Sequence, residues 1–212
     1  MEAVHRPCAG CYEGAVLRIP YPIVIEWSAG SSDVGDFSWP GSGRAIVKAN
    51  VYESIVNEFP IVRSEPVEMF QDPALRMPKN KRRAKPRVWL PYEGPNLMEI
   101  VPIDSVPAHP RTTWTITSRC KVCGQEGTRL DGYELKEHRW SQEKRDLIPF
   151  LKRREPGMGL FVSERSIGDR AIFRVSELYA WIFCTDKFKQ FIKSKGFTNI
   201  DFLEYGELVA NE

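Results

Sequence analysis

The sequence lacks any long apolar run, and this absence narrows the classes of protein that it can encode. No window of the 212-residue chain approaches the ~18–20 apolar residues of a membrane-spanning helix. The residues before Cys8 contain no apolar core, so we expect no secretory signal peptide. These two observations predict a cytoplasmic protein with no membrane partner.

An excess of charge of one sign is also missing. The chain has 30 Lys and Arg against 28 Asp and Glu, and its formal net charge of +2 gives no global field that would attract nucleic acid. One basic run, residues 79–87, holds six Lys or Arg and lies between Pro78 and Pro91, which favours an exposed loop. Blocks of like charge are commonly solvated interaction segments, so nucleic acid is the less favoured partner for this run.

The sequence contains no recognisable catalytic constellation. Its three histidines, His5, His109 and His138, form no His-x-x-x-His pair, and there is no Gly-x-Ser-x-Gly motif or glycine-rich phosphate loop. Cys184 stands beside Phe183 in an apolar segment and is expected to be a core thiol rather than a nucleophile. Because catalysis needs convergent titratable groups, we predict that the protein is not an enzyme.

Cysteine is scarce, but four of the five cysteines are patterned. Cys8 and Cys11 form one Cys-x-x-Cys pair, and Cys120 and Cys123 form another. Such a turn points two thiolates at one position, and two such turns complete a tetrahedral zinc site. We therefore predict a structural Zn²⁺ held by these four residues, in a reducing compartment that does not support a disulfide framework.

The second pair is the better formed of the two. Gly124 follows it and can adopt the positive φ that closes the turn, so that backbone amides point at sulfur. Arg119 and Lys121 can help to hold the thiolate charge. The first pair instead has Gly10 inside the turn and Tyr12 after it.

The separation of the two pairs far exceeds the ~15–20 residues of a simple zinc ribbon. A shared metal would thus staple distant parts of the chain into one domain. Two alternatives remain open: four buried, reduced cysteines without metal, or a redox dithiol with a depressed pKa. His5 is a fifth candidate ligand, although a lone His near a chain terminus is more often solvated.

Apolar periodicity predicts an α+β fold with mixed sheets and two strand–helix–strand units. The first unit has a strand at 44–48, a helix opened by Asn50 with Glu53 as its capping-box partner, and a strand at 61–70 after Pro60.

The second unit has a strand at 179–184 and a helix that begins after Thr185 and ends at Gly196. A strand is predicted at 197–205. The two units align with each other, which indicates either a degenerate duplication or the general likeness of such units. In this alignment three residues of the first helix match three of the second: Tyr52, Ile55 and Val56 with Phe188, Phe191 and Ile192.

The rest of the chain is predicted to hold further strands, a loop at 28–43 and a charged helix within 133–153. The further strands are expected at 19–27, 97–106 with an interruption at Pro102, 114–118, 157–162 and 171–175. We expect one zinc-stapled α+β domain over 1–212, with a possible N-terminal half, 1–110, and C-terminal half, 111–212. The six tryptophans are expected to be mostly core, with one or two exposed as anchors for a partner.

Taken together, the cysteine pairs and several later segments resemble the double-CxxCG-motif proteins of myxobacteria and their relatives. The later segments are Gly157-Met158-Gly159-Leu160-Phe161, Phe173-Arg174-Val175, Phe183-Cys184-Thr185-Asp186-Lys187-Phe188 and the stretch from Gly196 to Phe202. The sequence departs from the family pattern at Tyr12, where the motif has Gly.

Members of that family are regarded as immunity proteins against toxins delivered by cell–cell contact. The resemblance implies that this chain binds and neutralises a cognate protein toxin by occlusion, and that Cys8, Cys11, Cys120 and Cys123 carry over as the motif cysteines. We expect toxin contacts in the charged segments 76–87 and 133–146. The alternative function is a zinc-ribbon protein that binds nucleic acid or regulates another protein.

Overall fold

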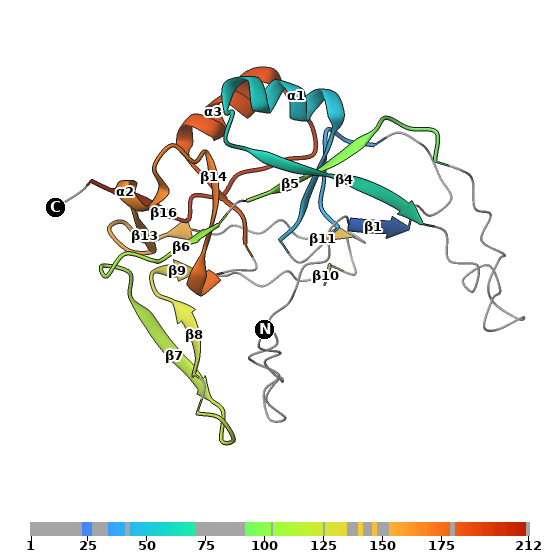
Figure 1. Cartoon of the computed structure of the whole chain (residues 1–212). Helices are drawn as coiled ribbons and strands as arrows, with labels where there is room; N and C mark the ends of the chain where they lie inside the picture. Colours follow the sequence, from blue (N-terminus) through green and yellow to red (C-terminus); the bar gives the residue numbers. More distant parts are fainter. Residues whose placement is uncertain are drawn as a thin grey trace, which may run out of the picture. The chain divides into compact units, whose positions relative to one another are not determined.

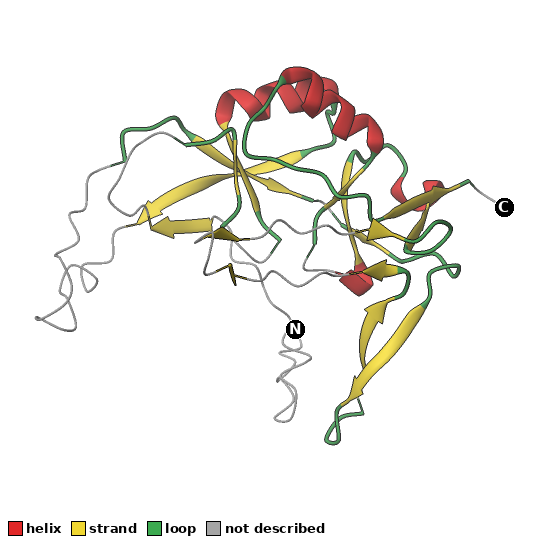
Figure 2. Ribbon diagram, turned by 180° about the vertical axis from the view of Figure 1, so that it is seen from behind, coloured by secondary structure: helices red, strands yellow, loops and turns green. Residues whose placement is uncertain are grey.

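The computed structural model describes most of the chain (Figures 1 and 2). The described residues are 23–26, 34–40, 43–70, 92–102, 104–124, 126–134, 140–141, 146–147, 153–178 and 181–210. They form a mixed α+β structure with three α-helices and several small sheets, which confirms the predicted fold class at this level.

The described residues divide into two compact units that alternate along the sequence. The hairpin unit takes its described residues from 107–168 and 202–212, and the sheet unit from 20–106 and 169–201. The single domain over 1–212, with halves at 1–110 and 111–212, stays a prediction.

The main sheet of the sheet unit has five strands. Their order is β1 (Ile23–Glu26), β4 (Arg63–Phe70), β5 (Leu97–Val101), β3 (Ala45–Lys48) and β2 (Phe37–Ser38). β1 runs parallel to β4, and all other neighbours are antiparallel. β3 and β4 confirm the strands predicted at 44–48 and 61–70, whereas β2 lies in a stretch predicted as loop.

Helix α1 (Ala49–Glu58) follows β3 without a side-chain cap. Its N-cap is Lys48, and the backbone N–H of Ala49 donates to the carbonyl of Asn96 at 2.9 Å. The prediction that Asn50 caps this helix is therefore wrong, since Asn50 lies within the first turn. A terminal N–H of the helix is satisfied instead by the Asn96 carbonyl, in the chain before β5. Pro60 lies just beyond the helix end, as predicted.

Helix α3 (Asp186–Lys195) has both predicted end signals. The Thr185 hydroxyl accepts a hydrogen bond from the Phe188 backbone N–H at 3.3 Å. Gly196 adopts φ +66° and its N–H donates to the carbonyl of Lys193 at 3.1 Å. The preceding strand β15 (Phe183–Cys184) also lies where a strand was predicted.

Both helices lie over one face of the main sheet (Figure 2). The ring of Phe59, just after α1, lies 5.4 Å from the rings of both Phe188 and Phe191 on α3. The buried pairs are Val51 with Ile55 on α1 and Phe188 with Ile192 on α3. By burial, Val51 and Ile55 of α1 therefore match Phe188 and Ile192 of α3. The predicted alignment differs by one residue, because it matches Tyr52 with Phe188 and Val56 with Ile192.

The strand predicted at 197–205 is wrong. In this described stretch the chain forms no strand after α3 until β16 (Gly206–Val209). Thr198 and Asn199 instead hydrogen-bond to β2 and its flanks: the backbone N–H of Phe37 donates to the Thr198 carbonyl at 3.3 Å. A turn with Asn199 at φ +59° thus replaces the extended segment.

A second sheet of the sheet unit has the order β15, β14 (Ile172–Val175) and β6 (Ser105–Val106). β14 pairs antiparallel with β15 and parallel with β6. β5 and β6 confirm the predicted 97–106 strand with its break at Pro102. A short 3₁₀ turn, Ser176–Leu178, follows β14.

The hairpin unit contains a β-hairpin and a two-stranded parallel sheet. The hairpin pairs β7 (Trp114–Arg119) with β8 (Glu126–Leu130), and β13 (Leu160–Ser163) runs parallel to β16. Gly206 is required in β16, because a Cβ there would lie 1.7 Å from the Leu160 carbonyl oxygen. The four-residue helix α2 (Glu164–Ile167) follows β13.

The charged helix predicted within 133–153 is wrong for the described residues. They form two antiparallel pairs, β9 (Tyr133–Glu134) with β12 (Arg153–Arg154), and β10 (Trp140–Ser141) with β11 (Asp146–Leu147). Along the sequence, β10 and β11 lie between β9 and β12. Backbone pairing along the chain has overridden a local pattern that favoured a helix.

Candidate metal centre

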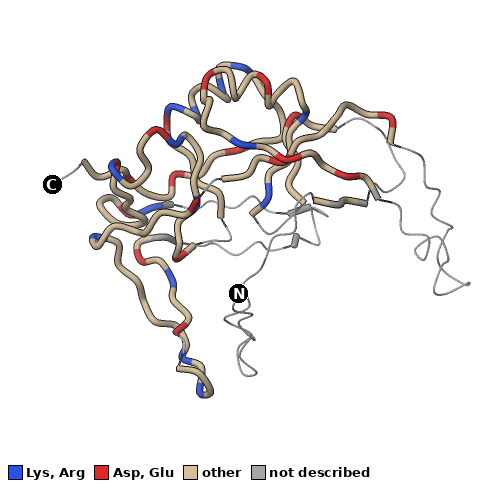
Figure 3. The backbone as a smooth tube through the Cα atoms, viewed as in Figure 1, with Lys and Arg blue, Asp and Glu red and all other residues tan. Residues whose placement is uncertain are grey.

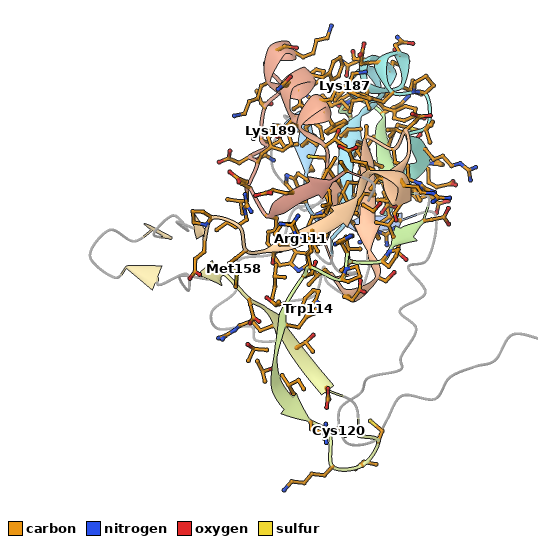
Figure 4. The ribbon with its side chains drawn as sticks, turned by 90° about the vertical axis from the view of Figure 1, so that its left-hand side faces the viewer. Arg111, Trp114, Cys120, Met158, Lys187 and Lys189 are labelled. Atoms are coloured by element: carbon orange, nitrogen blue, oxygen red, sulfur yellow. The ribbon has the colours of Figure 1, made fainter. Side chains whose placement is uncertain are left out.

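The β7–β8 hairpin carries the second cysteine pair at its tip. Its strands pair Trp114 with Leu130 at the base and Arg119 with Glu126 next to the turn. A shift of register falls between Ile116 and Ser118, so Thr117 forms a bulge, and its hydroxyl donates to the Gly127 carbonyl at 3.1 Å. Figure 4 shows Trp114 near the base of the hairpin and Cys120 at its far end.

The base of the hairpin is anchored in its unit. Leu130 is buried, and the Asp131 backbone N–H donates to the Thr113 carbonyl at 3.1 Å. The Thr115 hydroxyl donates to the Asp131 carboxylate at 2.5 Å. Beyond this base most of both strands is exposed, including Ile116, whose exposed fraction is 55%.

The turn from Cys120 to Gly124 is closed by backbone hydrogen bonds to Cys120. Gly124 adopts φ +76° and its N–H donates to the Cys120 carbonyl at 3.0 Å. The backbone N–H of Val122 points at the Cys120 sulfur, with a nitrogen-to-sulfur distance of 3.4 Å. The predicted positive φ and the predicted amide-to-sulfur contact are therefore both confirmed. Such amides stabilise a thiolate as a metal ligand.

Most residues of the turn are exposed. Cys120 is half-buried, Cys123 is exposed, and the Val122 side chain between them is 70% exposed. No lid of apolar side chains covers the turn within the described residues. Two thiolates at one turn supply half of a tetrahedral zinc site, so further ligands must come from elsewhere.

One of the two charged residues predicted to help hold the thiolate charge, Arg119, also forms a contact across the hairpin. The Arg119 guanidinium forms an ion pair with the Glu126 carboxylate across the hairpin, with a 2.9 Å hydrogen bond from Nε. Arg119 therefore links the two strands next to the cysteines. Sequence reasoning missed Glu126, because it predicted the strand at 114–118 but not the strand that pairs with it after the turn.

Only half of the predicted ligand set lies in the part of the chain that the structure describes. Cys120 and Cys123 are brought together in one turn, whereas Cys8, Cys11 and His5 lie outside the described residues. Within the described ranges, no group of three or more His, Cys, Asp or Glu side chains is placed to hold a metal. The four-cysteine zinc site stays a prediction.

The fifth cysteine lies in the sheet unit and has a different environment. Cys184 pairs with Ile172 in the β14–β15 ladder and is half-buried. Burial, followed by the nearby Asp186 carboxylate, raises the pKa of the Cys184 thiol to about 12. This thiol is thus protonated at neutral pH, which suits neither a nucleophile nor a metal ligand.

Of the remaining predicted candidates, His109 and part of the segment 133–146 are described. His109 lies in a loop, where its Nδ1 accepts from the Arg111 N–H at 3.2 Å. His138 and the segment 76–87, which includes the whole basic run at 79–87, lie outside the described residues. Of the segment 133–146, the described residues belong to strands β9, β10 and β11.

No protein-family model matches the chain, and the searches of curated proteins and of solved structures return no significant match. None of the described helices is long and apolar enough to cross a bilayer.

Proposed function

We propose that this chain is an immunity protein that binds a cognate protein toxin and neutralises it by occlusion. In this proposal Cys120 and Cys123 form half of a structural zinc site, and Cys8 and Cys11 form the other half. The protein acts in the reducing cytoplasm of the cell that makes the toxin or of its kin, where thiols persist as metal ligands.

The observation that carries the zinc part is the knuckle at the tip of the β7–β8 hairpin. The positive φ of Gly124 and the Val122 amide directed at the Cys120 sulfur favour a thiolate that binds metal. Arg119 and Glu126 pair directly behind the turn and hold the two strands together. A redox dithiol would need no second pair of cysteines.

The stability of the hairpin gives a second reason to expect a metal. A two-stranded hairpin is marginal by itself in water, and this one exposes most of its length. A structural zinc supplies folding free energy to just such small elements. A metal at the tip would fix the end that the buried Leu130 at the base does not reach.

The immunity part rests on the resemblance to the double-CxxCG-motif proteins. The sequence also offers no recognisable catalytic motif, which favours a protein that acts by binding. Specificity would lie in exposed loops and strands, because these vary while a scaffold is retained. The competing function, a nucleic-acid-binding zinc ribbon, would use the same knuckle together with the basic run at 79–87.

The test is affinity capture of the tagged chain from its native cells, followed by a neutralisation assay. A captured protein is expressed in a sensitive host with the chain, without it, and with the variants Cys120→Ser and Cys184→Ser. We expect the chain to restore growth, Cys184→Ser to behave like the unsubstituted chain, and Cys120→Ser to fail because the zinc site is lost.

Two results would contradict the proposal. One is a captured protein whose toxicity is the same with and without the chain. The other is capture of RNA, ribosomes or polymerase with an affinity that falls steeply with salt, which would instead indicate nucleic-acid binding.

A further inference from the structure

Trp39, just after β2, is held in a fixed position although about half of it is in water. Its indole stacks on the fully buried ring of Phe37, with centroids 6.1 Å apart and planes 15° apart. Its Nε1–H donates to the Asn199 carbonyl at 3.0 Å. The exposed fraction of the residue is nevertheless 49%. A large rigid aromatic side chain with its outer surface exposed is typical of an interface anchor.

The turn after α3 contacts both Trp39 and the neighbouring residues of β2. Asn199 adopts φ +59°, a region that non-glycine residues visit rarely, and its Nδ2 donates to the Phe37 carbonyl at 2.7 Å. The Thr198 backbone N–H and hydroxyl each donate to the Asp36 carboxylate at 2.9 Å. Strain of this kind persists where the surrounding structure fixes it, and it gathers at binding sites.

Lys193 and Lys195 lie in the last turn of α3, a few residues before the turn that bonds Trp39. The Lys195 Nζ lies 5.5 Å from the centroid of the Phe191 ring, which contacts Phe197, which in turn contacts Phe37. Lys193 is also exposed. Among the described residues, neither Lys193 nor Lys195 forms an ion pair.

Acidic residues also lie near the turn that bonds Trp39: Asp36, and Asp201, an exposed residue two positions after Asn199. Asp36 is already bonded to Thr198 and to Lys48, whose Nζ lies 3.2 Å from its carboxylate. Along α3 itself there are four lysines and one acid, Asp186. In Figure 3 basic positions, drawn in blue, recur along this helix. The C-terminal half of α3, which leads into the turn that bonds Trp39, therefore carries Lys193 and Lys195 and no acidic residue.

We propose that Trp39, Lys193 and Lys195, here called the Trp39 patch, are a docking surface for an acidic protein segment. The indole would seat against an apolar group of the partner, and the two ammonium groups would pair with carboxylates at the rim of the contact. This inference builds on the proposed function, since it names the surface at which a toxin with an acidic face would be bound. Under this inference the main contact with the toxin is the Trp39 patch and not the tip of the β7–β8 hairpin.

The test uses a phage-displayed library of random short peptides, panned against the immobilised full chain. Enriched peptides are synthesised, and their dissociation constants are measured with the unsubstituted chain and with Trp39→Ala and Lys195→Glu. The matched controls are Ile61→Ala, an exposed apolar residue elsewhere in the sheet unit, and Lys187→Glu, at the other end of α3. Thermal unfolding of each variant is recorded beside the binding data.

We expect the enriched peptides to combine Asp or Glu with an apolar residue. Trp39→Ala should weaken their binding by about tenfold or more, as for an anchor residue. Lys195→Glu should weaken it by about fivefold or more, by replacing attraction with repulsion. Both controls should stay within about twofold, as expected of residues outside a contact. Because Lys195→Glu leaves the indole and its support in place, it tests the patch even if Trp39→Ala unfolds.

Peptides without acidic residues, peptides that bind Trp39→Ala as tightly as the unsubstituted chain, or a library that yields no enrichment would each overturn the inference. Displacement of the peptides by a single-stranded oligonucleotide at physiological salt would also overturn it, in favour of nucleic acid. The result is separable from the proposed function. Binding at the patch without toxin neutralisation would contradict only the immunity role, and neutralisation that Trp39→Ala and Lys195→Glu leave intact would contradict only the patch.

Discussion

At the scale of single residues, a nearly buried polar contact of the sheet unit is the ion pair between Arg44 and Glu99. The guanidinium donates to both carboxylate oxygens, with Nε and Nη2 each at 2.5 Å. The side chains are only 11% and 2% exposed. A buried carboxylate of this kind is tolerated because its partner is bidentate and in place.

Glu99→Gln should therefore be strongly destabilising, because it removes the carboxylate charge that the largely buried Arg44 guanidinium contacts through two hydrogen bonds. We expect a loss of about 3–5 kcal/mol in the free energy of unfolding, measured by urea denaturation. Glu65 lies opposite Glu99 in the β4–β5 register but is exposed, so Glu65→Gln is the matched control. It should change stability by no more than about 0.5 kcal/mol. Equal losses in the two variants would show that the buried pair has no special role.

Cys184 gives a second prediction at this scale. Folding raises its pKa from 9.0 to about 12, mainly by burial, so at pH 8 the thiolate fraction falls from about a tenth to about a ten-thousandth. Alkylation by iodoacetamide, followed by peptide mass spectrometry, should be at least about a hundredfold slower at Cys184 in the native chain than in urea.

The same shift makes a stability contribution that depends on pH. Because the folded state holds this proton more tightly, the contribution is fully present below pH 9 and is lost as the pH rises toward 12. Cys184→Ser should lose less stability than the unsubstituted chain across this window. For the alkylation experiment, equal rates of reaction of iodoacetamide with Cys184 in the native chain and in urea would contradict the burial of this thiol.

At the scale of elements, the two long helices show what local sequence can and cannot reveal. The ends of α3 were predictable because Thr185 and Gly196 act within one turn of the helix. The start of α1 was not, because its first N–H is bonded by Asn96, which is distant in sequence. The 197–205 segment was misread as a strand for the same reason: its turn is fixed by Asp36 and Phe37 across the unit.

The candidate metal centre also has features that adjacent residues predict and features that depend on distant residues. The knuckle turn at Cys120–Gly124 was predictable from adjacent residues, and the structure has its positive φ and its amide-to-sulfur contact. The partner of Arg119 was not, because it depends on the register of a hairpin with a bulge at Thr117. The Trp39 surface was predictable only as the expectation that some tryptophan would be exposed.

Gly124 offers a test of the knuckle with an internal control. Gly124 and Gly157 have nearly the same φ, +76° and +74°, and at neither would a Cβ meet another atom within 4 Å. Substitution by Ala should therefore cost about 1–2 kcal/mol at either position, through backbone strain alone. Only Gly124→Ala should also weaken zinc binding, by about five- to thirtyfold in competition with a chromophoric chelator. Equal zinc affinities in Gly124→Ala and Gly157→Ala would contradict a metal at this turn.

At the scale of the whole molecule, the units are assembled from segments that are distant in sequence. β13 pairs in parallel with β16, and β14 pairs in parallel with β6. Local periodicity predicts such strands but does not indicate which strands pair with each other. The order of strands in each sheet could therefore not be predicted from the sequence. The proposed zinc adds one more connection of this long-range kind, between residues 8–11 and 120–123.

The central claim is that both cysteine pairs share one structural Zn²⁺, and metal stoichiometry tests it most directly. The full chain is purified under reducing conditions, its zinc is counted by plasma mass spectrometry, and the bond lengths are measured by X-ray absorption. We expect one zinc per chain, bound by four sulfurs at about 2.3 Å. Cys8→Ser and Cys120→Ser should each abolish tight binding, and Cys184→Ser should leave it unchanged. A metal-free chain, or zinc that Cys8→Ser retains in full, would contradict the account.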